Sequence, residues 1–258
     1  MYKLSHAWER KIDLIYLLTL KEVALKYKRT FLGIFWSLLN PLLMTLVYFI
    51  AFKVFMRFKV DNYTFFLLSA LFPWTWFSSS LIISARSLVD NVSLIKKVVF
   101  PRSYLVAAVI NAQLVNLIFS IPILLFLAFF YTGGPAWCWV IGIPLLIAIQ
   151  FLFTLGITLI VSISNTYFRD IEYLVGVFMN LIFWMTPIIY PMSSVPEKYR
   201  PLFFLNPLTS LMSAWRELFL HNTLQWKESG IALGMALLTW GIGVAVFRKL
   251  ERRLDEVL

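Results

Sequence analysis

The sequence is short of the residues that keep a protein in water. Residues 103–168 contain no Asp, Glu, Lys, Arg or His, and charged residues make up only 14% of the chain. A water-exposed surface needs charged side chains, so a soluble fold could not use this run. One bilayer crossing takes about 20 apolar residues, and a Gly-Gly-Pro turn signal lies near the middle, at 133–135. We therefore predict two membrane-spanning helices here, with Arg102 and Arg169 on the same side of the membrane.

Other absences exclude several kinds of chemistry. The single cysteine, Cys138, cannot form an internal disulfide. The chain lacks the Gly-x-x-x-x-Gly-Lys-Ser/Thr loop that cradles ATP phosphates, and it has no Cys, His and carboxylate cluster with metal-ligand spacing. No acid lies inside the predicted spans, which disfavours an ion-coupled transporter, although sodium sites built from backbone carbonyls remain open. The sequence thus predicts no catalytic residue, no metal site and no cofactor in this chain.

What the chain does contain is apolar. Hydrophobic residues make up 60% of it and aromatic residues 17%, more than ordinary globular proteins use. Charge-free windows of about the length that a bilayer requires occur at 30–52, 62–85, 104–131, 137–165, 173–196 and 229–247. These windows predict an all-α integral membrane protein with six transmembrane helices.

One further apolar piece is too short to cross the membrane. Residues 201–215 are interrupted by Pro201 and Pro207, and an apolar stretch continues at 218–226. Such a segment is typical of a re-entrant or interfacial helix pair.

The net charge of +10 first suggests a nucleic-acid partner. The charges instead cluster between apolar runs, where topogenic signals and anionic lipid explain them better. With six spans both termini lie on one side, and most of the 23 Lys and Arg residues fall there. We therefore expect both termini in the cytoplasm and no nucleic-acid partner.

The chain is predicted to form a single domain, with an interface helix at 1–29, a six-span core at 30–248 and a cytoplasmic tail at 249–258. Apolar and basic residues share the first segment, which favours an amphipathic helix in the membrane interface. Its candidate lipid-phosphate ligands are Arg10, Lys11, Lys26, Lys28 and Arg29. A charged tail that merely sets orientation is the alternative.

Two predicted spans carry polar and aromatic residues at helical spacing. The first span has Trp36, Asn40, Met44 and Tyr48, and the fifth has Tyr173, Gly176, Asn180 and Trp184. An Asn that faces lipid is costly, so each Asn is expected to face protein or a cavity. Pore lining and helix–helix hydrogen bonding both remain open. Asn111, Gln113 and Asn116 on the third span favour packing.

The cytoplasmic segment 86–102 has a different pattern. After Asp90 it contains Leu94, Ile95, Lys96, Lys97 and Phe100, followed by Pro101 and Arg102. We predict a short helix over 94–102 whose exposed Leu94, Ile95 and Phe100 dock into a groove on another protein. A plain topogenic loop would need the lysines but not the apolar residues.

These pieces together resemble the permease subunits of type-two ABC exporters, in the polysaccharide-export branch. The matching strings are KYKRTFLG at 26–33, WSLLNPL at 36–42, FPWTWF at 72–77, LIKK at 94–97, FPR at 100–102, RDI at 169–171, FWMTPIIYP at 183–191 and LNPLT at 205–209. Each string alone is a weak signal, but together they cover most of the chain in family order.

The resemblance implies a homodimer that encloses a channel and binds two ABC ATPase subunits, which hold ATP and Mg. The first and fifth spans would line the channel, and the segment 94–102 would be the helix that receives the ATPase stroke. Pro201, Asn206, Pro207 and Arg216 would belong to outer gate helices. The expected function is export of a lipid-linked, O-antigen-like polysaccharide through the cytoplasmic membrane of a bacterium. Export of teichoic acid, capsule or a small lipid or drug is the alternative, and a membrane-embedded glycosyl- or acyltransferase is a remote one.

Overall fold

A computed structural model describes the backbone of residues 2–254 and the side chains of residues 11–254. All regular structure in this part of the chain is helical, as predicted. By length and composition, five helical segments could cross a membrane: Gly33–Phe55, Tyr63–Arg86, Ser103–Tyr131, Cys138–Tyr167 and Trp226–Glu251. The first combines η1 (Gly33–Phe35), α2 (Trp36–Tyr48) and the π-helix η2 (Phe49–Phe55), and the others are α3, α5, α6 and α10. They match five of the six predicted windows.

The fifth predicted window differs from the expectation. The only α-helix there is α7 (Ile171–Trp184), besides the short 3-10 helix η3 (Met192–Ser194). The 14 residues of α7 span about 21 Å at 1.5 Å per residue, less than a bilayer core of about 30 Å. The helix ends before Pro187, which has no N–H to continue the hydrogen-bond ladder. A non-helical segment follows, and it is buried at Thr186, Ile188 and Ile189.

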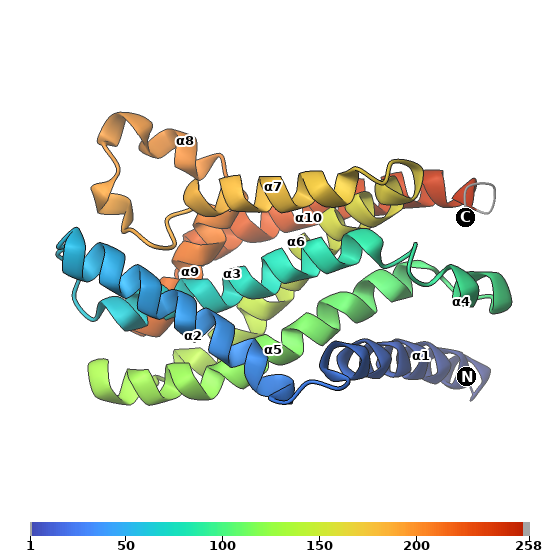
Figure 1. Ribbon diagram of the computed structural model, residues 1–258, viewed down its shortest axis with the longest axis horizontal. Helices are drawn as coiled ribbons and strands as arrows, with labels where there is room; N and C mark the ends of the chain where they lie inside the picture. The colour runs from blue at the N-terminus through green and yellow to red at the C-terminus, as the bar shows by residue number, and fades with distance from the viewer. Residues whose placement is uncertain (1, 255–258) are drawn as a thin grey trace.

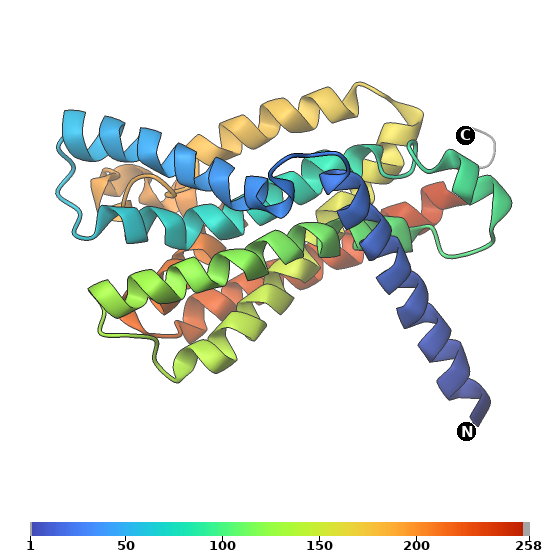
Figure 2. The same ribbon diagram turned by 60° about the horizontal axis from the view of Figure 1, so that its bottom comes forward.

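Helix α3 forms the centre of the bundle (Figure 1). It is the most buried of the five long segments and contacts α5, α6, α7 and α9. Trp76, Phe65 and Phe77 of α3 are almost fully buried. Helices α2 and α7 flank α3 (Figures 1 and 2), and most of their large apolar side chains stay exposed.

Helices α6 and α10 approach each other closely at two glycines. A Cβ placed on Gly243 would lie 2.2 Å from the carbonyl oxygen of Gly156, and one on Gly156 would lie 2.5 Å from the backbone of Thr239. Glycine is therefore required at this crossing, as small residues are at many membrane helix interfaces.

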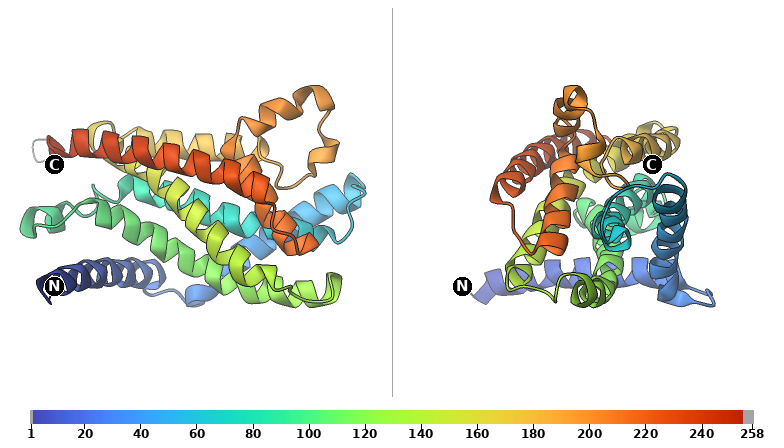
Figure 3. Two further views of the ribbon diagram at one scale, coloured as in Figure 1. Left: turned by 180° about the vertical axis from the view of Figure 1, so that it is seen from behind. Right: turned by 90° about the vertical axis from the view of Figure 1, so that its left-hand side faces the viewer.

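The two described ends of the chain lie at one end of the bundle, beside α4 (Val92–Lys97) (Figure 1). The α5–α6 turn and α8 (Arg200–Phe204) lie at the other end (Figures 1 and 3). Helix α1 (Tyr2–Tyr27) packs on α5 and runs obliquely across the bundle rather than along it (Figures 2 and 3). Its exposed apolar side chains are Ile12, Tyr16, Leu17, Leu20 and Leu25.

Two short-helix boundaries were predicted wrongly. The helix expected over 94–102 begins at Val92 and ends at Lys97, and Val98 is already extended (φ −131°, ψ 132°). Extended backbone suits the β-branched Val98 and Val99, and Pro101 disfavours helix in the residue before it.

Two helices occur in the segment for which an outer helix pair was predicted, α8 and α9 (Pro207–His221); their place on the outer side stays a prediction. They are separated at Asn206, whose side-chain oxygen accepts a hydrogen bond from the backbone N–H of Leu208 (3.1 Å) and so caps α9. Contrary to the expected continuation over 218–226, α9 ends at His221, where Asn222 is left-handed (φ 54°), and α10 begins at Trp226. Helix α9 is also largely buried, because it packs against α3, α6 and α10.

Candidate functional site

A groove of about 360 Å³ lies between α2, α3 and α7. Asn40, Met44 and Tyr48 line it from α2, and Gly176 and Asn180 line it from α7. The structure therefore brings together the polar faces of the first and fifth spans that the helical spacing indicated. Asn180 donates its own side-chain hydrogen bond back to the Gly176 carbonyl (3.1 Å).

Helix α3 supplies hydroxyl groups that the sequence reasoning missed. Thr75, Ser78 and Ser79 line the same groove. Thr75 donates to the carbonyl of Leu71 (2.7 Å), and Ser78 donates to that of Thr75 (3.4 Å). Their signal was visible as consecutive hydroxyl residues at 78–80 inside an apolar window. The groove thus combines carboxamides, hydroxyls and an aromatic ring.

Three predicted channel residues lie elsewhere. Tyr173 and Trp184 are exposed on α7 and do not line the groove, and Trp36 lines a neighbouring cavity. Phe183, which the sequence reasoning did not single out, lines the groove instead and contacts two other aromatic rings. Its ring centroid lies 5.8 Å from that of Tyr48 and 5.5 Å from that of Trp74.

The neighbouring cavity measures about 440 Å³ and lies where the end of α1 meets α2, α3 and α5. It shares Asn40, Thr75 and Ser79 with the groove. Lys26 Nζ donates to Gln113 Oε1 across the cavity (2.6 Å). Tyr27 and Asn116 also line the cavity. Two polar side chains from α1 (Lys26 and Tyr27) therefore face two from α5 (Gln113 and Asn116).

The hydrogen bonds of this cavity connect α1 to α5. Tyr27 OH donates to Asn116 Oδ1 (2.6 Å), and Asn116 Nδ2 donates to Gln113 Oε1 (3.0 Å). The packing role predicted for Gln113 and Asn116 is in this respect confirmed. Burial lowers the pKa of Lys26 to about 8, because a charged ammonium loses hydration there.

The other predicted lipid-phosphate residues do not line this cavity. Lys11, Lys28 and Arg29 are exposed, as Lys26 is. Arg29 adopts a left-handed backbone (φ 60°) at the turn after α1. The side chain of Arg10 lies outside the described residues.

The predicted docking helix exposes different residues from those expected. Leu94, Ile95 and Phe100 pack against the hydrophobic core of the chain itself. The exposed apolar residues are Val98 and Val99, which follow the exposed Lys96 and Lys97. The exposed part of this segment is thus the end of α4 together with this extended pair.

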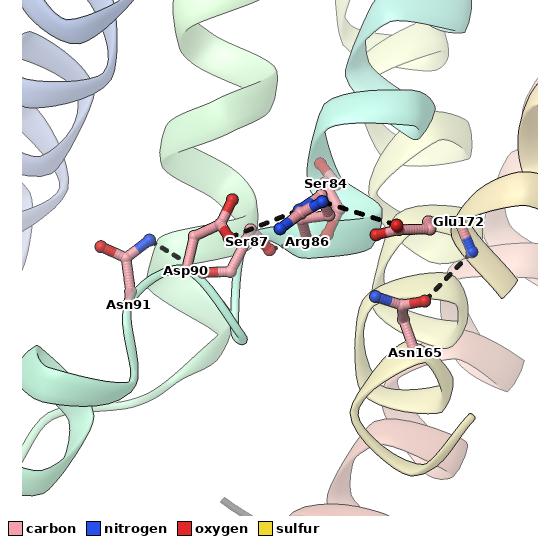
Figure 4. Close-up of polar contacts among 7 residues, drawn as sticks. All are labelled: Ser84, Arg86, Ser87, Asp90, Asn91, Asn165 and Glu172. Atoms are coloured by element: carbon pink, nitrogen blue, oxygen red, sulfur yellow. Dashed lines mark hydrogen bonds and ion pairs between the residues drawn. The ribbon is translucent and has the colours of Figure 1, made fainter. Parts of the chain in front are cut away.

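Polar contacts tie this segment to the bundle (Figure 4). Arg86, at the end of α3, lies 3.4 Å from Asp90 Oδ1 and 3.5 Å from Glu172 Oε1. Asn165 Oδ1 accepts a hydrogen bond from the backbone N–H of Glu172 (3.0 Å). Arg86 thus links the turn before α4 to the first turn of α7, one of the helices of the groove.

Neighbouring contacts attach the same end of the molecule to α1 and α10. Lys21 of α1 hydrogen-bonds Asn91, and Asn91 Nδ2 donates to the carbonyl of Ser87 (2.8 Å). Arg102 donates to the backbone carbonyl of Glu251 (3.1 Å).

At the opposite end, Arg216 holds the non-helical segment after α7. Its guanidinium donates to the carbonyls of Pro187 and Ile188 (2.9 Å each), and its carbon lies 3.7 Å from the ring centroid of Phe66. Tyr63 OH donates to the next carbonyl, that of Ile189 (2.9 Å). Non-helical backbone at membrane depth needs such partners, because no water is there to supply them.

The remaining predicted gate residues shape the ends of α8 and α9. Pro201 lies in the first turn of α8, and Pro207 begins α9. Asn206 Nδ2 donates to Thr186 Oγ1 (2.9 Å), which joins the start of α9 to the end of α7. Their assignment to a gate, like that of Arg216, stays a prediction. Within the described residues no group of three His, Cys, Asp or Glu side chains could hold a metal ion.

Comparison with known proteins adds the family. Residues 13–220 match the ABC-2 type transporter family. The O-antigen export system permease protein RfbA of Klebsiella pneumoniae is 38% identical over 246 residues, which cover 95% of each protein. RfbA of Myxococcus xanthus is 37% identical over 215 residues, or 83% of this chain and 82% of that protein.

A more distant relative is the polysialic acid transport protein KpsM of Escherichia coli. It is 25% identical over 243 residues, which cover 92% of this chain and 93% of that protein. The family match spans most of the apolar segments and the groove between α2, α3 and α7. The chain therefore belongs to the ABC-2 type transporter family, as a multi-pass membrane component of a transporter rather than an enzyme.

Proposed function

We propose that the chain is the permease subunit of an ATP-driven exporter that moves a lipid-linked, O-antigen-like polysaccharide across the cytoplasmic membrane of a bacterium. The observation that carries the proposal is the similarity to O-antigen export permeases at 38% identity along 95% of the chain. The relative named for polysialic acid transport, at 25%, is more distant. Capsule-type export is accordingly the second candidate.

The groove has chemistry that suits a sliding sugar chain. Carboxamides and hydroxyls such as Asn40, Asn180 and Ser78 can exchange hydrogen bonds with sugar hydroxyls, and Tyr48 offers a ring face to sugar C–H groups. Contacts of this kind are numerous and individually weak, which lets a polymer enter and leave a pore.

The proposed assembly is a homodimer of six-span subunits with both termini in the cytoplasm. Helices α2 and α7 face the second copy, because they carry the groove residues Asn40 and Asn180, whose carboxamides lipid cannot satisfy. The channel then lies between the two copies of the groove. In this arrangement α7 is the fifth span, completed by the segment that Arg216 holds.

The proposed power source is a pair of separate ABC ATPase subunits that bind ATP and Mg. They dock on Lys96, Lys97, Val98 and Val99, and their approach on ATP binding moves α4 and the helices attached to it. Helix α1 lies in the interface on membrane lipid, with its basic residues toward lipid phosphates.

The proposal is tested by co-expression with a candidate ATPase subunit and measurement of ATP turnover in lipid vesicles. We expect co-purification and stimulation of turnover by the lipid-linked glycan. Val99→Asp should weaken co-purification, whereas the control Ser93→Asp, an exposed position in the first turn of α4, should have a smaller effect. Transport by the purified chain without any ATPase would reject the proposal, and stimulation only by an acidic capsule glycan would favour the second candidate.

A further inference from the structure

The cavity between α1 and α5 holds a cation without a carboxylate partner among the described ion pairs. Lys26 Nζ contacts the neutral amide oxygen of Gln113 (2.6 Å), and its distance to the Tyr27 ring centroid is 5.4 Å. An ammonium has three N–H donors, so one bond to Gln113 leaves capacity for a second acceptor. Lys26 as a whole residue is exposed, so a ligand can reach it. Its ammonium end lies in the cavity lining, where an accompanying anion stabilises a cation that has lost part of its hydration.

The other polar groups in the cavity reinforce this preference. Gln113 is only 3% exposed, and its oxygen already accepts from both Lys26 and Asn116. That oxygen is therefore satisfied and holds the lysine in place. Among the residues that line the cavity, only Lys26 and Tyr27 can titrate, so the lining contributes one positive charge and no negative charge at neutral pH.

The shape of the cavity suits an amphipathic ligand. Trp36 and Leu43 belong to its lining and are about half exposed, so the cavity opens along α2. Phe72, Trp76 and Leu117 form an apolar wall. The polar and apolar parts lie side by side, as the headgroup and the first carbons of a lipid would require.

We propose that this cavity binds the anionic phosphate-ester headgroup of a membrane lipid, with Lys26 at the phosphate and the indole of Trp36 beside the adjoining apolar carbons. A lysine ammonium is a common phosphate ligand, and its hydrogen bonds to a phosphate oxygen are charge-assisted. The inference rests on the proposed function only in taking α2 to be embedded in the membrane. Two sources share this headgroup chemistry: the lipid carrier of an exported glycan and a phospholipid of the bilayer.

Binding is tested with the full chain in nanodiscs that contain phosphatidylcholine and a small fraction of one labelled probe. The probes are a polyprenyl phosphate, phosphatidylglycerol and, as the neutral reference, the polyprenol without phosphate. We expect one or both anionic lipids to be retained above the polyprenol. Lys26→Gln should lower that retention about tenfold, the factor that corresponds to about 1.4 kcal/mol. The matched control is Lys59→Gln, because Lys59 is exposed, does not line the cavity and is not a candidate lipid-phosphate ligand.

A second variant keeps the test decisive if Lys26→Gln fails to fold. Gln113→Glu has nearly the same size and places a carboxylate 2.6 Å from Lys26 Nζ, at the position of the present amide oxygen. It should preserve the fold and abolish retention, because the lysine then has an internal counter-ion. Lys26→Arg should keep the binding.

Each outcome decides a point. Retention of the polyprenyl phosphate alone assigns the site to the carrier lipid, and retention of phosphatidylglycerol alone assigns it to the bilayer; both support the site. Competition by inorganic phosphate at constant ionic strength supports recognition of the phosphate itself. Retention unchanged by both Lys26→Gln and Gln113→Glu would overturn the proposal. These assays need no ATPase, so this failure is distinct from a lack of glycan-stimulated ATP turnover.

Discussion

Replacing Arg216 with Met should destabilise the protein more than any loss of charge at its surface. The substitution keeps a long side chain but removes the donors to the carbonyls of Pro187 and Ile188. Those carbonyls belong to the buried, non-helical segment after α7, where no helical N–H can replace the lost donors. The expected result is a loosened junction between α7 and α9.

The magnitude follows from the two lost bonds. A buried polar group left without its partner costs about 1–3 kcal/mol, while side-chain hydrogen bonds measured inside a membrane protein average only about 0.6 kcal/mol. Arg216 Nε has no partner among the described atoms, so removing the guanidinium also recovers part of its own desolvation cost. Two bonds then give an expected loss of about 1–4 kcal/mol in the free energy of unfolding.

The assay is equilibrium unfolding by SDS titration in mixed micelles. Arg200→Met is the matched control, because Arg200 also donates to two backbone carbonyls, those of Val195 (3.0 Å) and Ser193 (3.4 Å), at a more exposed position. Water can replace those bonds, so the control should lose less than about 1 kcal/mol. Equal stabilities for the Arg216→Met and Arg200→Met variants would refute the role assigned to Arg216.

Three other predictions concern the packing, the coupling and the lipid site. Gly243→Ala should lower the free energy of unfolding by about 1–3 kcal/mol in the same SDS titration, because its Cβ would lie 2.2 Å from the carbonyl oxygen of Gly156. The control Gly241→Ala has open space around it and should be neutral. Equal losses for the two variants would contradict the close approach of α6 and α10. Arg86→Glu should lower glycan-stimulated ATP turnover, while the free energy of unfolding falls by less than about 1 kcal/mol. Adding Glu172→Arg should restore turnover, because it rebuilds the ion pair with the charges exchanged. No recovery in the double variant would count against the link between Arg86 and α7. Retention of phosphatidylglycerol should fall as the pH rises from about 7 to about 9, because burial lowers the pKa of Lys26 to about 8 and the ammonium loses its charge above that pH. The phosphodiester keeps its charge over this range. A Lys26→Arg variant, which stays protonated, should therefore show no fall in retention.

The long apolar segments could be predicted well because hydrophobicity is a local property. A charge-free window near 20 residues has few alternatives to a spanning helix, and α3, α5, α6 and α10 all occur where such windows occur. The fifth window was less predictable. It is free of charge throughout, yet its α-helix ends at Trp184, before Pro187 and the segment that Arg216 contacts.

The candidate site was predicted in part for a similar reason. Helical spacing places Asn40, Met44 and Tyr48 on one face of α2, and the structure finds that face in the groove. Spacing says nothing about which exposed residues a neighbouring helix covers, so it could not show that Tyr173 and Trp184 lie outside the groove of the single chain. Their assignment to the channel stays a prediction. Leu94 and Ile95 are less exposed than predicted, because their packing against the core depends on helices distant in sequence. Their docking role stays a prediction.

By itself the sequence determined that this chain is a helical membrane protein, how its apolar windows are ordered and where its turns and charged segments fall. These properties follow from hydrophobicity, proline and charge, which act within one or two turns of the chain. Tertiary structure alone decided the pairings across the fold. Lys26 meets Gln113, Gly156 meets Gly243, and Arg216 meets the carbonyls after α7. The two members of each pair lie far apart in the sequence, so their contact depends on how the helices pack. Local sequence propensity does not encode that packing.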